Sequence, residues 1–267
     1  MSSIVTSQGI VHYEAYGRGS PVILLHGWLG SWGYWLETME SLKKQHRCYA
    51  LDFWGFGESG KRRSSYSISD FVDLVDQFMD RLGIESAPVV GHSMGGTVAL
   101  SLALMRPERV QRVVVVGSPI VGSSLNIFLR LAGRPWIASI VWQLPSALQF
   151  GIKFFSPFIV KDSNAWYKMI TRDLSRTTLE AFFLSINSLH NTDLRPQLPG
   201  LTTPIIGIYG VGDNVVSPSQ ANVIASSAPV SRVKIMEGSR HFPMLDEPES
   251  FNESLAEFLS YRFPALN

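Results

Sequence analysis

The sequence has little cysteine and little charge. Its single cysteine among 267 residues, Cys48, excludes an internal disulfide framework and a cysteine-based zinc cluster, and it lies in an expected buried strand, as a structural thiol would. Lysine and arginine number 23 against 22 aspartates and glutamates, so the net charge of +1 argues against a nucleic-acid binder. Charged residues make up 17%, below the roughly 25% of average globular domains, whereas hydrophobic residues reach 45%. This composition excludes an intrinsically disordered chain.

Targeting signals and long apolar runs are also missing. Residues 1–20 lack the basic segment and apolar stretch of a secretory signal peptide. No segment reaches the roughly 20 apolar residues that span a bilayer. The nearest candidate, 135–152, is interrupted by Gln143, Pro145 and Gln149. We therefore expect a soluble cytoplasmic protein, and peripheral contact with a membrane is left open.

Short apolar runs alternate with helical patterns along most of the chain. Two β-rich runs, 3–6 and 11–16, flank a Gln-Gly turn, and further strands are expected at 21–25, 47–51, 88–90, 113–116, 205–209 and 233–236. Helices are expected at about 34–45, 71–82, 94–105, 219–227 and 249–262, with Ser67 or Ser69 as the N-cap of the second. The alternation predicts an α/β fold with a mostly parallel sheet, helices on both faces and an antiparallel leading hairpin.

A long segment without strand patterning interrupts this alternation. Residues 119–199 are helical and aromatic in pattern and follow the sixth expected strand. We interpret them as a helical cap (a lid) inserted into a core domain formed by 1–118 and 200–267. Ligands in open α/β sheets bind outside the carboxyl ends of the strands, and the cap is expected to lie there.

The strongest chemical signal is Gly91-His92-Ser93-Met94-Gly95-Gly96. It fits the pattern G-x-S-x-G and lies between an expected strand and an expected helix, which is the context that gives the pattern meaning. The glycines allow a sharp turn that exposes the Ser93 hydroxyl, and the helix N-terminus favours negative charge there. A Gly-rich turn without catalytic function would fit the same five-residue pattern. The presence of partner residues must therefore decide whether Ser93 is catalytic.

A serine nucleophile needs a base, and the base needs an orienting acid. Of six histidines, only His241 lies in a loop directly after the last expected strand, and Asp213 directly follows the strand before it. The chain order Ser93, Asp213, His241 is that of one hydrolase fold. The alternative for Asp213 is a turn-capping aspartate, and the rival carboxylates are Asp246, Glu247 and Asp193.

Acyl transfer also needs two backbone N–H groups that face the developing oxyanion. Met94, the residue after the nucleophile, is expected to supply one. The other is expected from Trp28, in the loop after the third strand, where Gly27 lets the backbone approach closely. His26, in the same loop, is expected to be a structural, hydrogen-bonding histidine.

Taken together, these motifs resemble the α/β-hydrolase superfamily over essentially the whole chain. The matching segments are residues 26–28 (His-Gly-Trp), 52–59 (Asp-Phe-Trp-Gly-Phe-Gly-Glu-Ser), 91–96, 212–213 (Gly-Asp) and 241–248 (His-Phe-Pro-Met-Leu-Asp-Glu-Pro). The resemblance implies an eight-stranded sheet, a cap after the sixth strand and a triad of Ser93, Asp213 and His241. It also implies that 52–59 is a structural loop, in which we expect Asp52 to bind backbone groups.

The first half of the cap has a distinctive composition. Residues 119–161 carry a net charge of +4 with no acidic residue, from Arg130, Arg134, Lys153 and Lys161. Seven aromatic residues lie in the same stretch: Phe128, Trp136, Trp142, Phe150, Phe154, Phe155 and Phe158. One interpretation is a lipophilic substrate presented at an anionic membrane surface. The interpretation we favour is that most of these rings pack the cap helices and line an acyl pocket.

The expected activity is that of a serine hydrolase that cleaves a small-molecule ester or thioester with a hydrophobic acyl group, through an acyl-enzyme and without metal or organic cofactor. A serine nucleophile separates the chain from the dehalogenase and epoxide-hydrolase branches of the superfamily, which use aspartate. The alternatives are a carbon–carbon bond hydrolase or lyase with the same triad, and a non-catalytic ligand-binding homologue.

Overall fold

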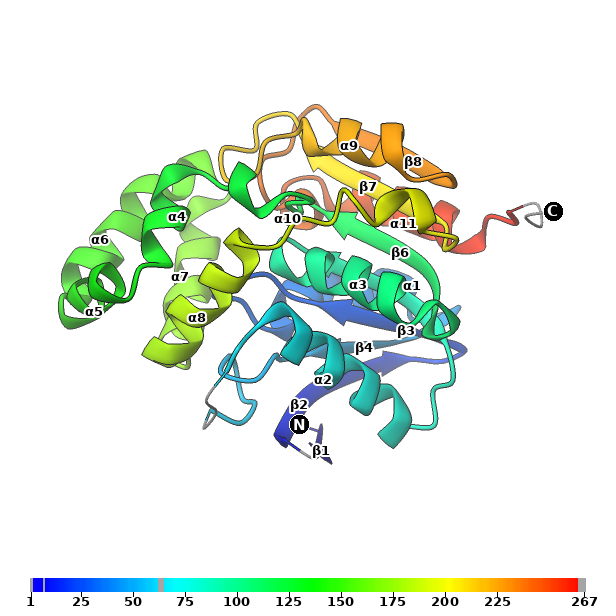
Figure 1. The fold of residues 1–267 in the computed structure, drawn as a ribbon, viewed down its shortest axis with the longest axis horizontal. Coiled ribbons are helices and arrows are strands. Elements are labelled where there is room, and N and C mark those ends of the chain that lie inside the picture. Colours follow the sequence, from blue (N-terminus) through cyan, green and yellow to red (C-terminus); the bar gives the residue numbers. More distant parts are fainter. Residues whose placement is uncertain (1, 7, 62–64, 264–267) are drawn as a thin grey trace.

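One twisted sheet organises the molecule (Figure 1). In the computed structural model, which describes residues 2–6, 8–61 and 65–263, eight strands pair in the order β1-β2-β4-β3-β5-β6-β7-β8. Their bounds are β1 (Ser2–Thr6), β2 (Gly9–Gly17), β3 (Ser20–Leu25), β4 (His46–Leu51), β5 (Ala87–His92), β6 (Val110–Val116), β7 (Ile205–Gly210) and β8 (Ser231–Met236). Pairing is antiparallel between β1 and β2 and between β2 and β4, and parallel elsewhere. The expected mostly parallel sheet with an antiparallel hairpin at one edge is confirmed.

Helices cover both faces of the sheet. The helices outside residues 119–199 are α1 (Leu36–Leu42), α2 (Ile68–Arg81), α3 (Met94–Met105), α9 (Gln220–Ser227), α10 (Pro243–Asp246) and α11 (Pro248–Ser260). Helices α2 and α3 contact each other on one face, and α1 and α11 contact each other on the opposite face. The central strands are therefore apolar on both sides, and all four valines from Val113 to Val116 are fully buried. Cys48 in β4 is buried as well, and burial raises the pKa of its thiol to about 12, as expected of a structural cysteine.

Local sequence signals explain where the helices begin and end. Ser67, one of the two expected caps, forms a capping box with Asp70 at the start of α2, and Gly83 follows the helix at φ +67°. The helix expected at 34–45 is shorter than predicted. It begins as a 3-10 turn at Trp32–Trp35, and α1 ends at Leu42. The Lys43 carbonyl, at the end of α1, accepts a hydrogen bond from the N–H group of Arg18, which lies in the connection between β2 and β3. A backbone carbonyl at the end of the helix therefore has a partner.

Residues 119–199, which we call the cap, lie between β6 and β7 in the chain. Their helices are α4 (Ile127–Ala132), α5 (Pro135–Gln143), α6 (Pro145–Phe155), α7 (Ser163–Leu174) and α8 (Leu179–His190), drawn in green to yellow-green beside the sheet in Figure 1. Polar contacts hold the cap to the rest of the chain. Ser31 donates to Asp173 at 2.8 Å, and the Gln220 side chain accepts from the N–H groups of Ile120 and Val121. The division into core and cap at these residue numbers stays a prediction.

Every helix in the described part of the chain falls short of the length and apolarity that crossing a bilayer requires. The cytoplasmic location stays a prediction.

Candidate active site

The three residues expected to form a triad lie in loops that follow three parallel strands. Ser93 follows β5, Asp213 follows β7 and His241 lies beyond β8. Because these strands are parallel, their carboxyl ends meet at one edge of the sheet. Ser93 and His241 line the same cavity, which the cap helices cover. The fold therefore brings residues far apart in sequence to one place.

Ser93 sits in a strained turn. Its φ of 50° and ψ of −118° are rare for a residue with a side chain, and its N–H donates to the Val116 carbonyl at 2.8 Å. The flanking glycines leave no room for a methyl group. A Cβ on Gly91 would lie 2.1 Å from the Gly95 carbonyl oxygen, and one on Gly95 would lie 2.5 Å from the His26 carbonyl oxygen. The turn forms because both positions are glycine.

The substitution Gly91→Ala is expected to destabilise the fold by about 3 kcal/mol or more, because the new methyl group meets rigid backbone. For a chain of this size the melting temperature should fall by roughly 6–12 °C in a thermal scan. Gly200→Ala is the matched control, since a Cβ there meets nothing within 4 Å. Equal melting temperatures for the two variants would contradict this account of the turn.

Asp213 and His241 form a buried pair. The Nδ1 atom of His241 lies 2.8 Å from Oδ2 of Asp213, and both side chains are almost fully buried. The other carboxylate oxygen accepts hydrogen bonds from the N–H groups of Val215 and Val216 at 2.8 and 2.9 Å. Asp213 therefore caps a turn and also binds the imidazole. An aspartate at Nδ1 keeps the proton on that nitrogen and leaves Nε2 able to accept another.

The rival carboxylates have other partners. Asp246 accepts from two backbone N–H groups, Glu247 from the Ser239 hydroxyl, and Asp193 from Arg195. Burial raises the pKa of Asp246, against the effect of those two backbone hydrogen bonds. Within the described residues, Asp213 is thus the carboxylate that is hydrogen-bonded to the His241 ring.

The two expected oxyanion donors are available. Within the described residues, neither the Trp28 N–H nor the Met94 N–H has a hydrogen-bond acceptor in the protein. Met94 is the first residue of α3, where backbone N–H groups have no partner inside the helix. Leu29 has a φ of 58°, so the Trp28 loop bends sharply. A Cβ on Gly27 would lie 3.1 Å from Cβ of Ser93, which shows how closely this loop approaches the Ser93 turn.

His92 and Gly117 lie against His241. Neither residue was singled out from the sequence. The Nε2 of His92 lies 2.9 Å from the His241 carbonyl oxygen, to which it donates, and the two rings are 4.7 Å apart. Burial lowers the pKa of His92 well below its ordinary value, so this histidine stays neutral. Gly117 has a φ of +52°, and a Cβ there would lie 3.3 Å from both Nδ1 of His241 and Oδ2 of Asp213. Two features of the sequence could have pointed to these residues: His92 lies inside the G-x-S-x-G motif, and Gly117 directly follows the four valines of an expected strand.

His26 and Asp52 have structural positions, as expected. His26 donates from Nδ1 to the Gly27 carbonyl at 2.7 Å and accepts at Nε2 from the Phe53 N–H at 3.0 Å. Asp52 accepts from the N–H groups of Trp32 and Glu58 and lies 2.8 Å from Nδ1 of His12. Burial alone would raise the pKa of Asp52, but the hydrogen bond with His12, the nearby His26 ring and the two backbone hydrogen bonds outweigh it and hold the pKa below its ordinary value.

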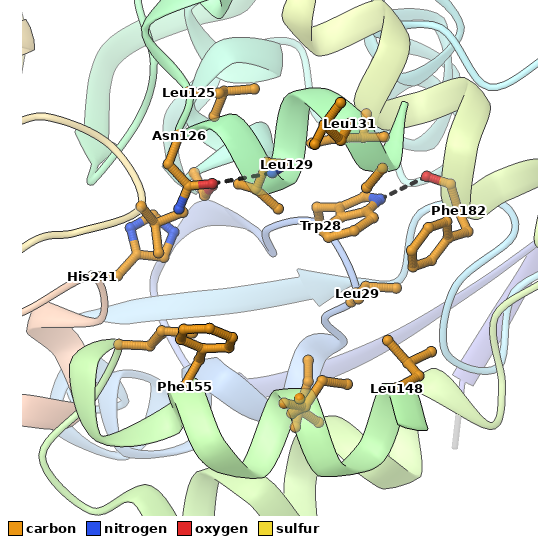
Figure 2. Close-up of a pocket in the computed structure, with 18 of the residues that line it drawn as sticks. Trp28, Leu29, Leu125, Asn126, Leu129, Leu131, Leu148, Phe155, Phe182 and His241 are labelled. Carbon is orange, nitrogen blue, oxygen red and sulfur yellow. Dashed lines mark hydrogen bonds between the residues drawn. The ribbon is translucent and has the colours of Figure 1, made fainter. Parts of the chain in front are cut away.

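An apolar cavity of about 770 Å³ extends from Ser93 and His241 into the cap (Figure 2). The described residues that line it include no lysine, arginine, aspartate or glutamate. Leu148 and Phe155 of α6 point into it from one side, and Trp28 and Leu29 border it on another. The Trp28 indole donates to the Phe182 carbonyl of α8 at 2.9 Å, so the loop that carries the expected oxyanion donor Trp28 is bonded to the cap.

The aromatic residues of 119–161 divide into two groups. Phe155 and Phe158 line the cavity, and Trp142 packs against Phe182. Trp136, Phe150 and Phe154 are instead 62%, 70% and 61% exposed. The side chain of Phe128 lies outside the described residues. The favoured interpretation, packing or pocket lining, therefore holds for only half of the described rings.

A family model described as the alpha/beta hydrolase fold matches residues 20–172, more than half of the chain. The chain belongs to the α/β-hydrolase family. This confirms the resemblance drawn from the motifs and the fold class predicted with it. The chain is accordingly a hydrolase.

Among curated proteins, similarity extends over nearly the whole chain. A pimeloyl-[acyl-carrier protein] methyl ester esterase of Vibrio campbellii is 28% identical over 262 residues, covering 93% of this chain and 98% of the relative. The protein of the same name from Nitrosomonas europaea is 29% identical over 256 residues, covering 90% and 96%. The crystal structure of the enol-lactonase from Burkholderia xenovorans LB400 superposes with a TM-score of 0.85 at 21% identity and covers 97% of this chain and all of that one. The structural match supports the fold.

Proposed function

We propose that this α/β-hydrolase is a serine esterase for esters or thioesters whose acyl group is long and apolar. The observation that carries the proposal is the uncharged cavity that joins Ser93 and His241 to the interior of the cap. The Asp213–His241 hydrogen bond and the two unpartnered N–H groups supply the remaining parts that acyl transfer needs. The relatives named as methyl ester esterases support an ester as the bond that is cleaved.

In the proposed mechanism, the Ser93 hydroxyl attacks the ester carbonyl while Nε2 of His241 takes its proton. Asp213 holds the proton of Nδ1 and stabilises the imidazolium that forms. The N–H groups of Trp28 and Met94 bind the tetrahedral oxyanion. His241 then protonates the departing alcohol or thiol, which leaves an acyl group on Ser93. Water, deprotonated by His241, hydrolyses this acyl-enzyme and releases the acid.

The cavity lining favours a substrate without charge on its buried part. A carboxylate inside it would lose its hydration without gaining a cationic partner, which is costly. The polar lining residues apart from Ser93 and the two histidines are Asn126 and Asn214. Asn126 uses its carbonyl oxygen to cap α4 through the Leu129 N–H, so it is partly committed to structure. We therefore propose substrates with simple apolar acyl chains in preference to acidic substrates.

Narrowing the cavity should shorten the preferred acyl chain. Leu148→Trp places a larger ring in the cavity, so kcat/KM for long p-nitrophenyl esters should fall by about 10-fold or more, because an overpacked pocket costs about 1–3 kcal/mol of binding. Activity on the acetate or butyrate ester should stay within about twofold of the wild type. The measurement is a kcat/KM series across chain lengths.

The matched control is Gln149→Trp, which adds the same ring one residue along α6 at an exposed position. This variant should keep the wild-type chain-length profile. If Leu148→Trp left the preference for long chains unchanged, the acyl group would not occupy this part of the cavity.

A further inference from the structure

Helices α5 and α6 are apolar on two sides. On α6, Leu148 and Ile152 face the cavity, whereas Phe150 and Phe154 are exposed and stack at 6.3 Å between ring centroids. On α5, Ile137 lines the cavity and Trp136 is exposed. A helix that covers a core needs one apolar stripe with a polar face opposite it. The exposed apolar side chains, Trp136, Phe150 and Phe154, therefore cover no core in the described part of the chain.

Exposed aromatic rings are concentrated in this region. Among the described residues, every phenylalanine or tryptophan with a largely exposed side chain lies within 136–158: Trp136, Phe150, Phe154, Phe155 and Phe158. Exposed Ile140 and Leu144 lie in the same segment, at the end of α5 and before α6. Figure 1 shows α5 and α6 at the outer end of the cap, away from the sheet. We call the outward-facing residues of 136–158 the outer cap surface. Scattered exposed apolar residues are ordinary, but a concentration of exposed apolar side chains on two neighbouring helices points to an interaction site.

The charged side chains of residues 119–161 are all basic. Arg130, Arg134 and Lys153 are exposed, and within the described residues none of them has a carboxylate partner. No acidic residue occurs between 119 and 161 in the sequence. Aromatic and aliphatic side chains next to unpaired cations are typical of segments that lie in the interface of an anionic bilayer.

The outer cap surface is continuous with the cavity. Ile140, Leu144, Phe155 and Phe158 are 42–55% exposed and also line the cavity, so they form its mouth. An apolar chain could pass from a bilayer into the cavity along these side chains without crossing water, which avoids the cost of hydrating its apolar surface. This continuity favours a lipid surface over a folded protein partner, which would cover the mouth.

We propose that the outer cap surface docks on an anionic lipid bilayer and that the substrate enters the cavity from the membrane. The phenylalanines and Trp136 insert at the level of the headgroups, and the arginines and Lys153 contact lipid phosphates. Delivery of the substrate by this route rests on the proposed esterase activity, whereas docking on the bilayer does not.

The test is flotation of the full chain with vesicles of phosphatidylcholine containing phosphatidylglycerol, and with vesicles of phosphatidylcholine alone. The wild type should float with the anionic vesicles and bind less at high salt, because salt screens the arginines and Lys153. The double variant Phe150→Ser/Phe154→Ser should bind at least about 10-fold more weakly, since two rings lose their burial. Arg134→Gln/Lys153→Gln should lower the affinity by about fivefold per charge.

The matched control is Val5→Ser/Met105→Ser, which removes two exposed apolar side chains outside the cap. This variant should bind vesicles as the wild type does. Hydrolysis of a soluble short-chain ester is measured on every variant, and the Phe150/Phe154 variant should keep it, since neither ring lines the cavity. The same variant should lose about 10-fold or more in rate on a long-chain ester embedded in anionic vesicles.

Absence of flotation, or flotation that the Phe150/Phe154 variant retains, would overturn the docking proposal. A concentration-dependent dimer that this variant abolishes would assign the surface to a second copy of the chain. Binding to an acidic protein but not to vesicles would assign it to a protein partner. If the wild type did not hydrolyse a soluble ester, the proposed function would be contradicted. The flotation result would still support or exclude docking on the bilayer.

Discussion

Replacing Ser93 with alanine is expected to lower kcat for ester hydrolysis by about 10⁵–10⁶-fold, because removing the nucleophile disables the whole triad. The variant should fold normally. The Ser93 side chain makes no hydrogen bond to another described residue, so alanine removes no hydrogen bond from the fold. The measurement is the steady-state rate on a p-nitrophenyl ester, together with a thermal scan.

Ser118→Ala is the control for this variant. Ser118 is also buried near the Ser93 turn. Among the described residues its hydroxyl bonds only to the Val116 carbonyl, at 3.4 Å, and it does not line the cavity. Activity should stay within about threefold of the wild type, since a weak hydrogen bond is lost. If Ser93→Ala kept more than a few per cent of the activity, another group would be the nucleophile.

The second large effect is expected for Asp213→Asn, which should lower kcat by about 10⁴-fold, the loss found for the equivalent change in a serine protease triad. An asparagine can donate to Nδ1 of His241, which would place the imidazole proton on Nε2 and remove the base. The N–H groups of Val215 and Val216 favour this arrangement. They bind the one side-chain oxygen of the asparagine, so its NH₂ group faces Nδ1 of His241.

Asp246→Asn provides the comparison, since Asp246 is a nearby carboxylate that binds backbone N–H groups and not the imidazole. It should reduce stability with little effect on kcat. The opposite result, with Asp246→Asn inactive and Asp213→Asn active, would assign the orienting acid to Asp246. Thermal scans of both variants separate loss of fold from loss of chemistry.

The strands could be predicted, and a triad could be proposed, because the signals for both are local. Runs such as 113–116 are apolar at every position, which is typical of a strand buried on both faces. Ser93 is marked by its glycines, and Asp213 and His241 are marked by their positions directly after strands. These patterns need only the topology of a parallel sheet to bring the residues together.

Other features depend on contacts between distant segments. The bond from the His92 ring to the His241 carbonyl joins residues 149 positions apart, and the Trp28 indole reaches Phe182 across 154. No local pattern specifies such pairs. The cap was also hard to predict, because α5 and α6 are apolar on two sides and periodicity alone does not say which side faces the core. The sequence indicated a basic, aromatic cap, but not that Trp136, Phe150 and Phe154 point outward.

The most direct test of the account is covalent labelling with a fluorophosphonate, followed by mass spectrometry of the intact chain and of its peptides. An activated serine attacks phosphorus, whereas ordinary serine hydroxyls do not react at a comparable rate. The account predicts one adduct per chain, located on Ser93, absent in Ser93→Ala and formed much more slowly in Asp213→Asn. An adduct on another residue, or ester hydrolysis by a chain whose Ser93 stays unlabelled, would contradict it.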